Sequence, residues 1–201
     1  MKKTVAFAVA LLLLLGAFLL LPVHGEGEIY DSVIRLHVLA NSDSDEDQAQ
    51  KLLVRDRVIE ITGVLLKDVQ TRDEAEAILR QNLGKLREEA AAVLRQNGCL
   101  DAVTVSLGEE DYPTRRYERL AFPAGEYLSL RVMIGEAAGA NWWCVLFPPL
   151  CLSAATTKGE AEEAFLAAGL TEEQYRIITD SGNGKYRLRF KILEVAGKWF
   201  D

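Results

Sequence analysis

Three stretches of the chain alternate hydrophobic and polar residues, which is the spacing of a strand with one buried face. They cover residues 32–39, 102–107 and 128–134. In the first stretch the odd-numbered side chains are expected on one face of the sheet and the even-numbered ones on the other. The odd-numbered set is Val33, Arg35, His37 and Leu39, and the even-numbered set is Ile34, Leu36 and Val38.

Other segments repeat apolar residues every three or four positions, which predicts helices. The first helix is expected to begin at Ser44, a good N-cap with Asp47 three residues further on. A second helix begins after Thr71 and stops at Asn97-Gly98. Shorter helices are predicted over 158–168 and from Thr171. Residues 185–200 fit a strand or a helix equally well. The apolar stripe of the first helix consists of Val54, Val58, Ile61 and Leu65.

This order of elements predicts one α+β domain over residues 26–201. A strand, two helices and then several strands around the turn "FPAGEY" favour a small mixed or antiparallel sheet. The helices are expected to pack on one face of that sheet. A signal or anchor helix is expected before the domain, in residues 1–25.

The N-terminus has the pattern of a secretory leader. Lys2 and Lys3 precede an unbroken apolar run over 5–21, and Val23-His24-Gly25 supplies short residues for cleavage. An uncleaved anchor is the alternative, because the run is nearly as long as the roughly 18–20 residues that span a bilayer. In both cases we expect the domain after Gly25 to lie outside the cytoplasm and to contact membrane only through this segment.

The net charge of the chain argues against some classes of binding partner. The chain has a net charge of −7, and removal of Lys2 and Lys3 with the leader makes it −9. An acidic chain without basic clusters does not suit nucleic acid. No motif indicates a cofactor or a small-molecule substrate, so we expect neither.

The most unusual segment is "NWWCVLFPPLC", residues 141–151. Thiols that lie this close outside the cytoplasm tend to pair, and Pro148-Pro149 can reverse the chain. We therefore predict a disulfide between Cys144 and Cys151, with Cys99 left as a free, buried thiol. A buried strand with reduced cysteines is the alternative. Trp142, Trp143 and Phe147 are either core or partner anchors, and in an extended strand the two tryptophans point opposite ways.

Two kinds of catalytic chemistry remain open but have little support. His37 and the three cysteines could hold zinc, yet no CxxC or HExxH spacing is present. A cysteine nucleophile with His37 as its base would also lack a local signature. We therefore favour a structural His37, hydrogen-bonded near the turn 41–43.

Short polar residues follow the first strand directly. Asn41, Ser42 and Asp43 are expected to fix the strand-to-helix junction through side-chain bonds to backbone N–H groups. We expect Arg35 to pair nearby with a carboxylate such as Asp31, Asp43 or Asp45. Arg35, His37, Asn41 and Asp43 are thus structural or contact candidates, and Glu126 and Tyr127 in "FPAGEY" are further candidates for partner contact.

Three segments carry a resemblance to a known family. They are "VIRLHVLANSDSDEDQAQKLLVRDRV", "YPTRRYERLAFPAGEYLSLRVMIGEAAGANWWCVLFPPLC" and "YRLRFKILE". All three resemble the stage II sporulation protein R family of endospore-forming Firmicutes. The resemblance implies a non-enzymatic signalling protein, exported from the forespore into the intermembrane space. Its implied partner is a membrane-embedded aspartic protease, which processes the pro-form of the mother-cell sigma factor. A thiol or metal enzyme and a cell-wall-binding module are the alternatives.

Overall fold

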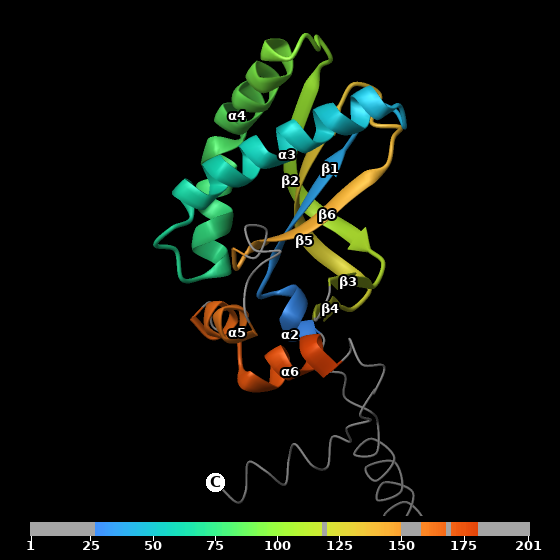
Figure 1. Cartoon of the computed structure of the whole chain (residues 1–201). Helices are drawn as coiled ribbons and strands as arrows, with labels where there is room; N and C mark the ends of the chain where they lie inside the picture. Colours follow the sequence, from blue (N-terminus) through green and yellow to red (C-terminus); the bar gives the residue numbers. More distant parts are fainter. Residues whose placement is uncertain (1–26, 118–119, 150–157, 168–169, 181–201) are drawn as a thin grey trace, which may run out of the picture.

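The computed structural model describes residues 27–117, 120–149, 158–167 and 170–180. Its main sheet has four strands in the order β2-β5-β1-β6 (Figure 1). The central strand β1 runs parallel to β5 and antiparallel to β6, and β2 is antiparallel to β5. The predicted α+β class with a mixed sheet is confirmed. The strands are β1 (Ile34–Leu39), β2 (Val103–Tyr112), β5 (Gly125–Ile134) and β6 (Asn141–Phe147).

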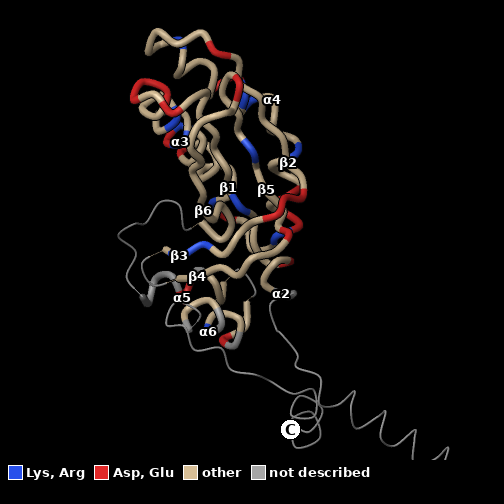
Figure 2. The backbone as a smooth tube through the Cα atoms, turned by 90° about the vertical axis from the view of Figure 1, so that its right-hand side faces the viewer, with Lys and Arg blue, Asp and Glu red and all other residues tan. Residues whose placement is uncertain are grey.

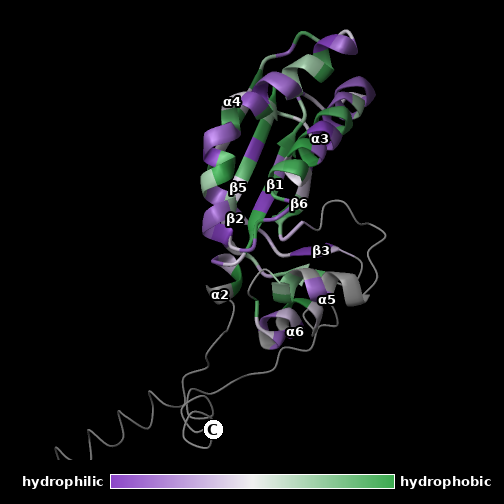
Figure 3. Cartoon of the chain, turned by 90° about the vertical axis from the view of Figure 1, so that its left-hand side faces the viewer, coloured by the Kyte–Doolittle hydropathy of each residue, from purple (hydrophilic) through white to green (hydrophobic). Residues whose placement is uncertain are grey.

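Two long helices cover one face of this sheet (Figures 1 and 3). Helix α3 (Asp45–Leu65) begins where predicted, because the Ser44 side chain accepts a hydrogen bond from the Asp47 N–H. Helix α4 (Arg72–Gln96) is capped by Thr71 in the same way. The even-numbered side chains of β1 form the main core with the apolar stripes of these helices. That core includes Ile34, Leu36, Val38, Val54, Val58, Ile61, Leu79, Leu86 and Leu94.

A second core lies on the opposite face, at one end of the sheet. A two-stranded sheet of β3 (Arg115–Tyr117) and β4 (Leu120–Phe122) contributes to it. So do the helices α2 (Gly27–Tyr30), α5 (Lys158–Ala167) and α6 (Glu172–Asp180). Its buried residues include Ile29, Val33, Tyr112, Phe122, Tyr127, Val145, Phe165 and Ile178. Helices α5 and α6 match the predicted ones, whereas β3 and β4 were not predicted.

The predicted leader and the segment 185–200 lie outside the described residues. Among the helices that the structure describes, none has the length and hydropathy needed to cross a bilayer.

Candidate functional site

Arg35 is fully buried in the centre of the sheet, and aromatic rings surround it. Its Nε donates to the Cys144 carbonyl oxygen at 3.1 Å, and its Nη2 donates to the Tyr117 hydroxyl at 2.9 Å. The guanidinium carbon lies 4.4 Å from the ring centroid of Tyr112, 4.9 Å from that of Tyr127 and 5.0 Å from that of Phe122. The ring faces and the two oxygen acceptors stabilise the positive charge of the buried guanidinium.

The predicted carboxylate partner of Arg35 was therefore wrong. No ion pair joins Arg35 to any residue in the described part of the chain. The physical reason is direction, because the side chain points across the sheet toward β6 and β3. Asp43 and Asp45 lie beyond the far end of β1, and Asp31 precedes its start.

His37 lies two residues further along the same face and is 4% exposed. Its Nδ1 lies 2.9 Å from Glu110 Oε1, and its Nε2 lies 2.9 Å from Asn141 Oδ1. Its ring stacks on that of Trp143, with centroids 3.7 Å apart and planes at 15°. The expectation of partners in the turn 41–43 was wrong, since β2 and β6 supply them. The residues that hold His37 come from strands far along the chain.

Glu110 compensates charge on this face of the sheet. Burial alone would raise the pKa of its carboxyl group, but hydrogen bonds from His37 and Ser129 and the nearby charges of His37 and Arg131 outweigh it and lower the pKa. Arg131 Nη1 lies 3.9 Å from the same carboxylate. His37 and Arg131 therefore both approach Glu110 Oε1, whereas its Oε2 is buried without a hydrogen-bond partner. Figure 2 shows basic residues on β3 and on the strands of the main sheet.

The tandem tryptophans point to opposite faces of β6, as predicted. Trp142 is 37% exposed, and the Arg55 guanidinium lies 4.3 Å from its ring centroid on the side of α3. Trp143 is half-buried on the other side, where Arg115 lies 4.8 Å from its ring. The backbone of β6 therefore separates two arginine–tryptophan pairs.

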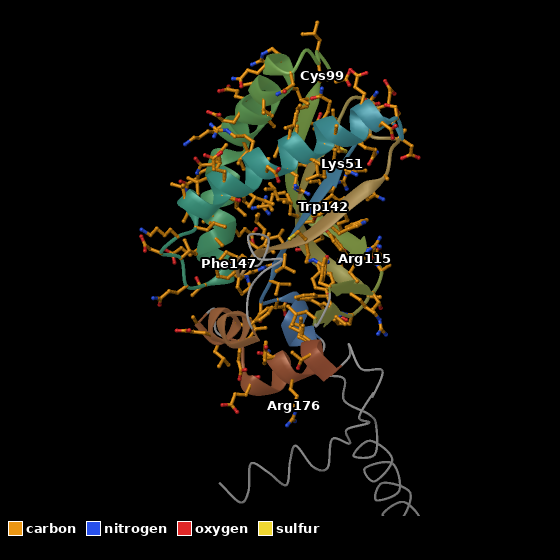
Figure 4. All side chains as sticks on the ribbon, in the orientation of Figure 1. Lys51, Cys99, Arg115, Trp142, Phe147 and Arg176 are labelled. Carbon is orange, nitrogen blue, oxygen red and sulfur yellow. The ribbon has the colours of Figure 1, made fainter. Side chains whose placement is uncertain are left out.

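Three other partner candidates differ in exposure. Glu126 is exposed and remains a candidate for contact. Tyr127 is fully buried, and its hydroxyl donates to the Pro123 carbonyl at 2.8 Å. Phe147 is 1% exposed and belongs to the main core (Figure 4). Tyr127 is buried in the second core and Phe147 in the main core. The suggestion that these two side chains contact a partner was therefore wrong.

The turn after β1 holds a distant loop. Asn41 Oδ1 accepts from the Glu136 N–H at 2.9 Å, and Asp43 Oδ1 accepts from the Ala140 N–H at 2.6 Å. The Asn41 carbonyl also accepts from the Ala138 N–H at 3.1 Å. The predicted side-chain bonds to backbone N–H groups exist, but those of Asn41 and Asp43 cross to the β5–β6 loop instead of staying in the turn.

Two glycines allow this close approach. A Cβ at Gly139 would lie 2.1 Å from the Ser42 carbonyl oxygen, and one at Gly135 would lie 2.2 Å from Asn41 Oδ1. Gly135 also has a positive φ of 54°, which favours glycine. The loop between β5 and β6 is therefore built around the turn 41–43.

Lys51 is a further part of this junction, which the sequence patterns did not reveal. It lies on α3, is 5% exposed, and its Nζ donates to the Ala140 carbonyl at 2.9 Å (Figure 4). Burial lowers the pKa of its ammonium group and outweighs the negative charge of Asp43, which raises it. No sequence pattern singled out this lysine, so only the fold identifies it.

The cysteines differ in state. Cys144 is disulfide-bonded. Cys99 is a free thiol, as predicted, but it is half-buried and not buried as expected. Cys151, the predicted partner of Cys144, lies outside the described residues, so this pairing stays a prediction. Within the described ranges, no three His, Cys, Asp or Glu side chains gather as metal ligands would.

Comparison with known proteins gives two matches. Residues 30–157 match the family described as Stage II sporulation protein R. Stage II sporulation protein R of Bacillus subtilis (strain 168) is 38% identical over 160 residues, which cover 75% of this chain and 71% of the relative. No solved structure gives a significant match. The polar residues around β1 and in the turn all lie within the matched range.

Proposed function

The chain belongs to the stage II sporulation protein R family, and from this membership we propose that it is an exported signalling protein that activates a membrane-embedded aspartic protease. A role in sporulation follows from the family itself. The observation that carries the finer proposal is the family match over residues 30–157, directly after a segment with the charge and hydropathy of a secretory leader. Signalling is proposed in preference to catalysis.

The proposed site of action is the space between the forespore and mother-cell membranes. There the exported domain binds the extracytoplasmic side of the protease and shifts it toward an active state. Such a shift requires that the domain bind the active state more tightly than the inactive one. The activated protease then removes the pro-segment of the mother-cell sigma factor.

Reconstitution tests this proposal. The purified protein is added to vesicles that hold the protease and its pro-sigma substrate, and processing is followed on gels. We expect cleavage to depend on the concentration of the added protein and to reach a plateau. A protease whose active-site aspartate is replaced serves as the control and should give no cleavage. Processing at the same rate with and without the protein would refute the activating role.

Export is tested separately. Expressed in a sporulating host, the protein should be recovered outside the cytoplasm of the cell that makes it, with a new N-terminus close to residue 26. Mass spectrometry of the N-terminal peptide checks this. Recovery of the intact leader in a membrane fraction would support a tethered protein instead, and recovery from the cytoplasm would contradict export.

A further inference from the structure

Strand β6 carries two arginine–tryptophan pairs that differ in charge compensation. Over Trp142, the Arg55 guanidinium has a carboxylate partner, since its Nη2 lies 2.6 Å from Asp56 Oδ1. Over Trp143, Arg115 has none. Among the described residues, nothing forms an ion pair or a hydrogen bond with Arg115. The second pair is therefore a cation and an aromatic ring without an anion.

Buried N–H groups without acceptors mark the same place. The Nε of Arg115 is buried and has no partner, and so is the Nη1 of the fully buried Arg35. Both arginines adjoin one aromatic group, because Arg35 lies over Tyr112 and the Tyr112 ring meets that of Trp143 at 4.5 Å. Buried donors without acceptors are uncommon in native proteins and call for a physical explanation.

The other charges on this face do not supply the missing anion. Glu110 lies 2.9 Å from His37 through its Oε1 and also lies near Arg131. Its Oε2 is buried without a hydrogen-bond partner, yet no ion pair joins it to Arg115 or Arg35. Arg115 and Arg35 thus add positive potential at one point of an acidic protein with a net charge of −7. Guanidinium groups favour carboxylates, which can accept two parallel N–H bonds.

The backbone of β6, next to Trp143, could pair with an extended peptide. In the described part of the chain, β6 pairs with β1 on one side only. A peptide segment added along the free edge of β6 would place alternate side chains on the face of Trp143. Arg115 lies beside this face of β6, because its guanidinium is 4.8 Å from the Trp143 ring centroid.

We propose that Arg115 and Trp143, backed by Arg35 and Tyr112, form a docking site for a glutamate or aspartate side chain on an extended segment of the protein partner. This Arg115–Trp143 site rests on the proposed function for the identity of the partner, which is the extracytoplasmic part of the membrane protease. The acidic side chain bonds Arg115 and lies beside the Trp143 ring. The Trp142–Arg55 pair, neutralised by Asp56, does not bind it.

The first test needs no protease. The full chain, purified in mild detergent with Trp142→Phe and Trp199→Phe, reports Trp143 fluorescence alone. It is titrated with a peptide that alternates alanine and glutamate, and with a matched alanine–glutamine peptide. We expect a saturable change with the glutamate peptide only, which weakens as salt is added. Arg115→Ala should weaken this binding at least tenfold, whereas the matched control Arg116→Ala, at its exposed neighbour, should leave it unchanged. No saturable change, or equal effects of both peptides or both variants, would overturn the site.

The second test identifies the partner. In the vesicle assay, Arg115→Ala and Arg115→Glu should raise the concentration needed for half-maximal processing at least tenfold, and Arg116→Ala should not. Circular dichroism and melting curves establish that each variant is folded. If wild-type protein activates the protease and Arg115→Ala acts equally well, the assignment of this partner to the site is wrong. If wild-type protein does not activate it, the proposed function fails, and the peptide titration still decides whether the site binds carboxylates.

Discussion

Arg35 is a buried cation that the fold stabilises with aromatic rings and carbonyl or hydroxyl oxygens in place of a carboxylate. A planar, delocalised guanidinium is suited to this environment because it is weakly hydrated and can stack on rings. A lysine ammonium is compact and strongly hydrated. Replacing Arg35 by lysine would therefore keep the charge but lower the stability of the fold.

We predict that Arg35→Lys lowers the free energy of unfolding by about 2–4 kcal/mol, because a buried ammonium would lose both the stacking and one of the two hydrogen bonds. Arg35→Met, which keeps similar volume without charge, should cost less than Arg35→Lys. Urea denaturation measures both. Tyr117→Phe, which removes only one hydroxyl acceptor, serves as control and should cost about 1 kcal/mol. Wild-type stability of the lysine variant would contradict this account.

The Glu110 carboxylate gives a stability term that depends on pH. Its pKa in the folded protein is lowered, since hydrogen bonds and charges from His37, Ser129 and Arg131 outweigh the effect of burial. A carboxylate with a lowered folded pKa stabilises the native state above its unfolded pKa. That contribution is lost as pH falls through the folded pKa.

Glu110→Gln keeps the shape and an acceptor for His37 but removes this charge. At neutral pH we expect the variant to be less stable than wild type by about 1–2 kcal/mol. The difference should shrink as pH falls below the range in which free glutamate titrates. Urea melts over a pH series measure it, and Glu88→Gln on the exposed side of α4 controls for the loss of one negative charge. A difference that stays constant at acid pH would show that the charge of Glu110 is not its cause.

At the scale of elements, the turn after β1 and the β5–β6 loop form one unit. Asn41 and Asp43 accept hydrogen bonds from the N–H groups of Glu136 and Ala140. Asn41→Ala and Asp43→Ala should each lower the unfolding free energy by roughly 1 kcal/mol or more. Thermal melts combined with the processing assay check this. If both variants melt like wild type yet fail to signal, the turn is a contact surface and its structural role is minor.

The glycines of this loop give a sharper prediction. Gly139→Ala should destabilise the protein by about 2–3 kcal/mol, because its Cβ would meet the backbone oxygen of Ser42, which cannot move aside easily. Gly135→Ala meets the Asn41 side chain, so part of its cost should disappear in an Asn41→Ala background. The control is Gly84→Ala in α4, where nothing lies within 4 Å. That variant should be more stable by about 0.5–1 kcal/mol. Equal melting temperatures for Gly139→Ala and wild type would refute the close packing.

Elements with a local cause could be predicted from the sequence, and contacts that depend on strand order could not. Ser44 and Thr71 cap helices through bonds to residues three positions away, so α3 and α4 were placed correctly. The alternation in β1 likewise separated its two faces. His37 meets Glu110 and Asn141, which are 73 and 104 residues away, because the sheet order places β6 on one side of β1 and β5 followed by β2 on the other. Periodicity carries no information about that order, so the partners of Arg35 and His37 were missed.

At the scale of the molecule, the sheet separates two cores of different character. The main core under α3 and α4 is aliphatic apart from Phe147, whereas the second core is rich in aromatic rings and includes Tyr112, Phe122 and Tyr127. Arg35 points from β1 toward the second core, and Trp143 packs against it. The proposed docking site therefore lies at the margin of a buried core of contacting aromatic rings, and such packing favours a fixed geometry when a partner binds.

The cysteines allow the covalent state of the whole chain to be predicted. Cys144 is disulfide-bonded, and burial raises the pKa of the Cys99 thiol, which lies near the end of α4 (Figure 4). A raised pKa leaves less thiolate at neutral pH and slows alkylation. Non-reduced native protein should therefore take up one iodoacetamide group, slowly and at Cys99, and denaturation should speed this reaction without adding a second group.

Peptide mapping without reduction should then show a Cys144–Cys151 link, and its reduction should lower the unfolding free energy by roughly 2–3 kcal/mol through the chain entropy of the small loop. Cys99→Ser is the matched variant, since it should abolish labelling and leave the linked peptide in place. A link that includes Cys99, or uptake of three groups before reduction, would contradict the pairing.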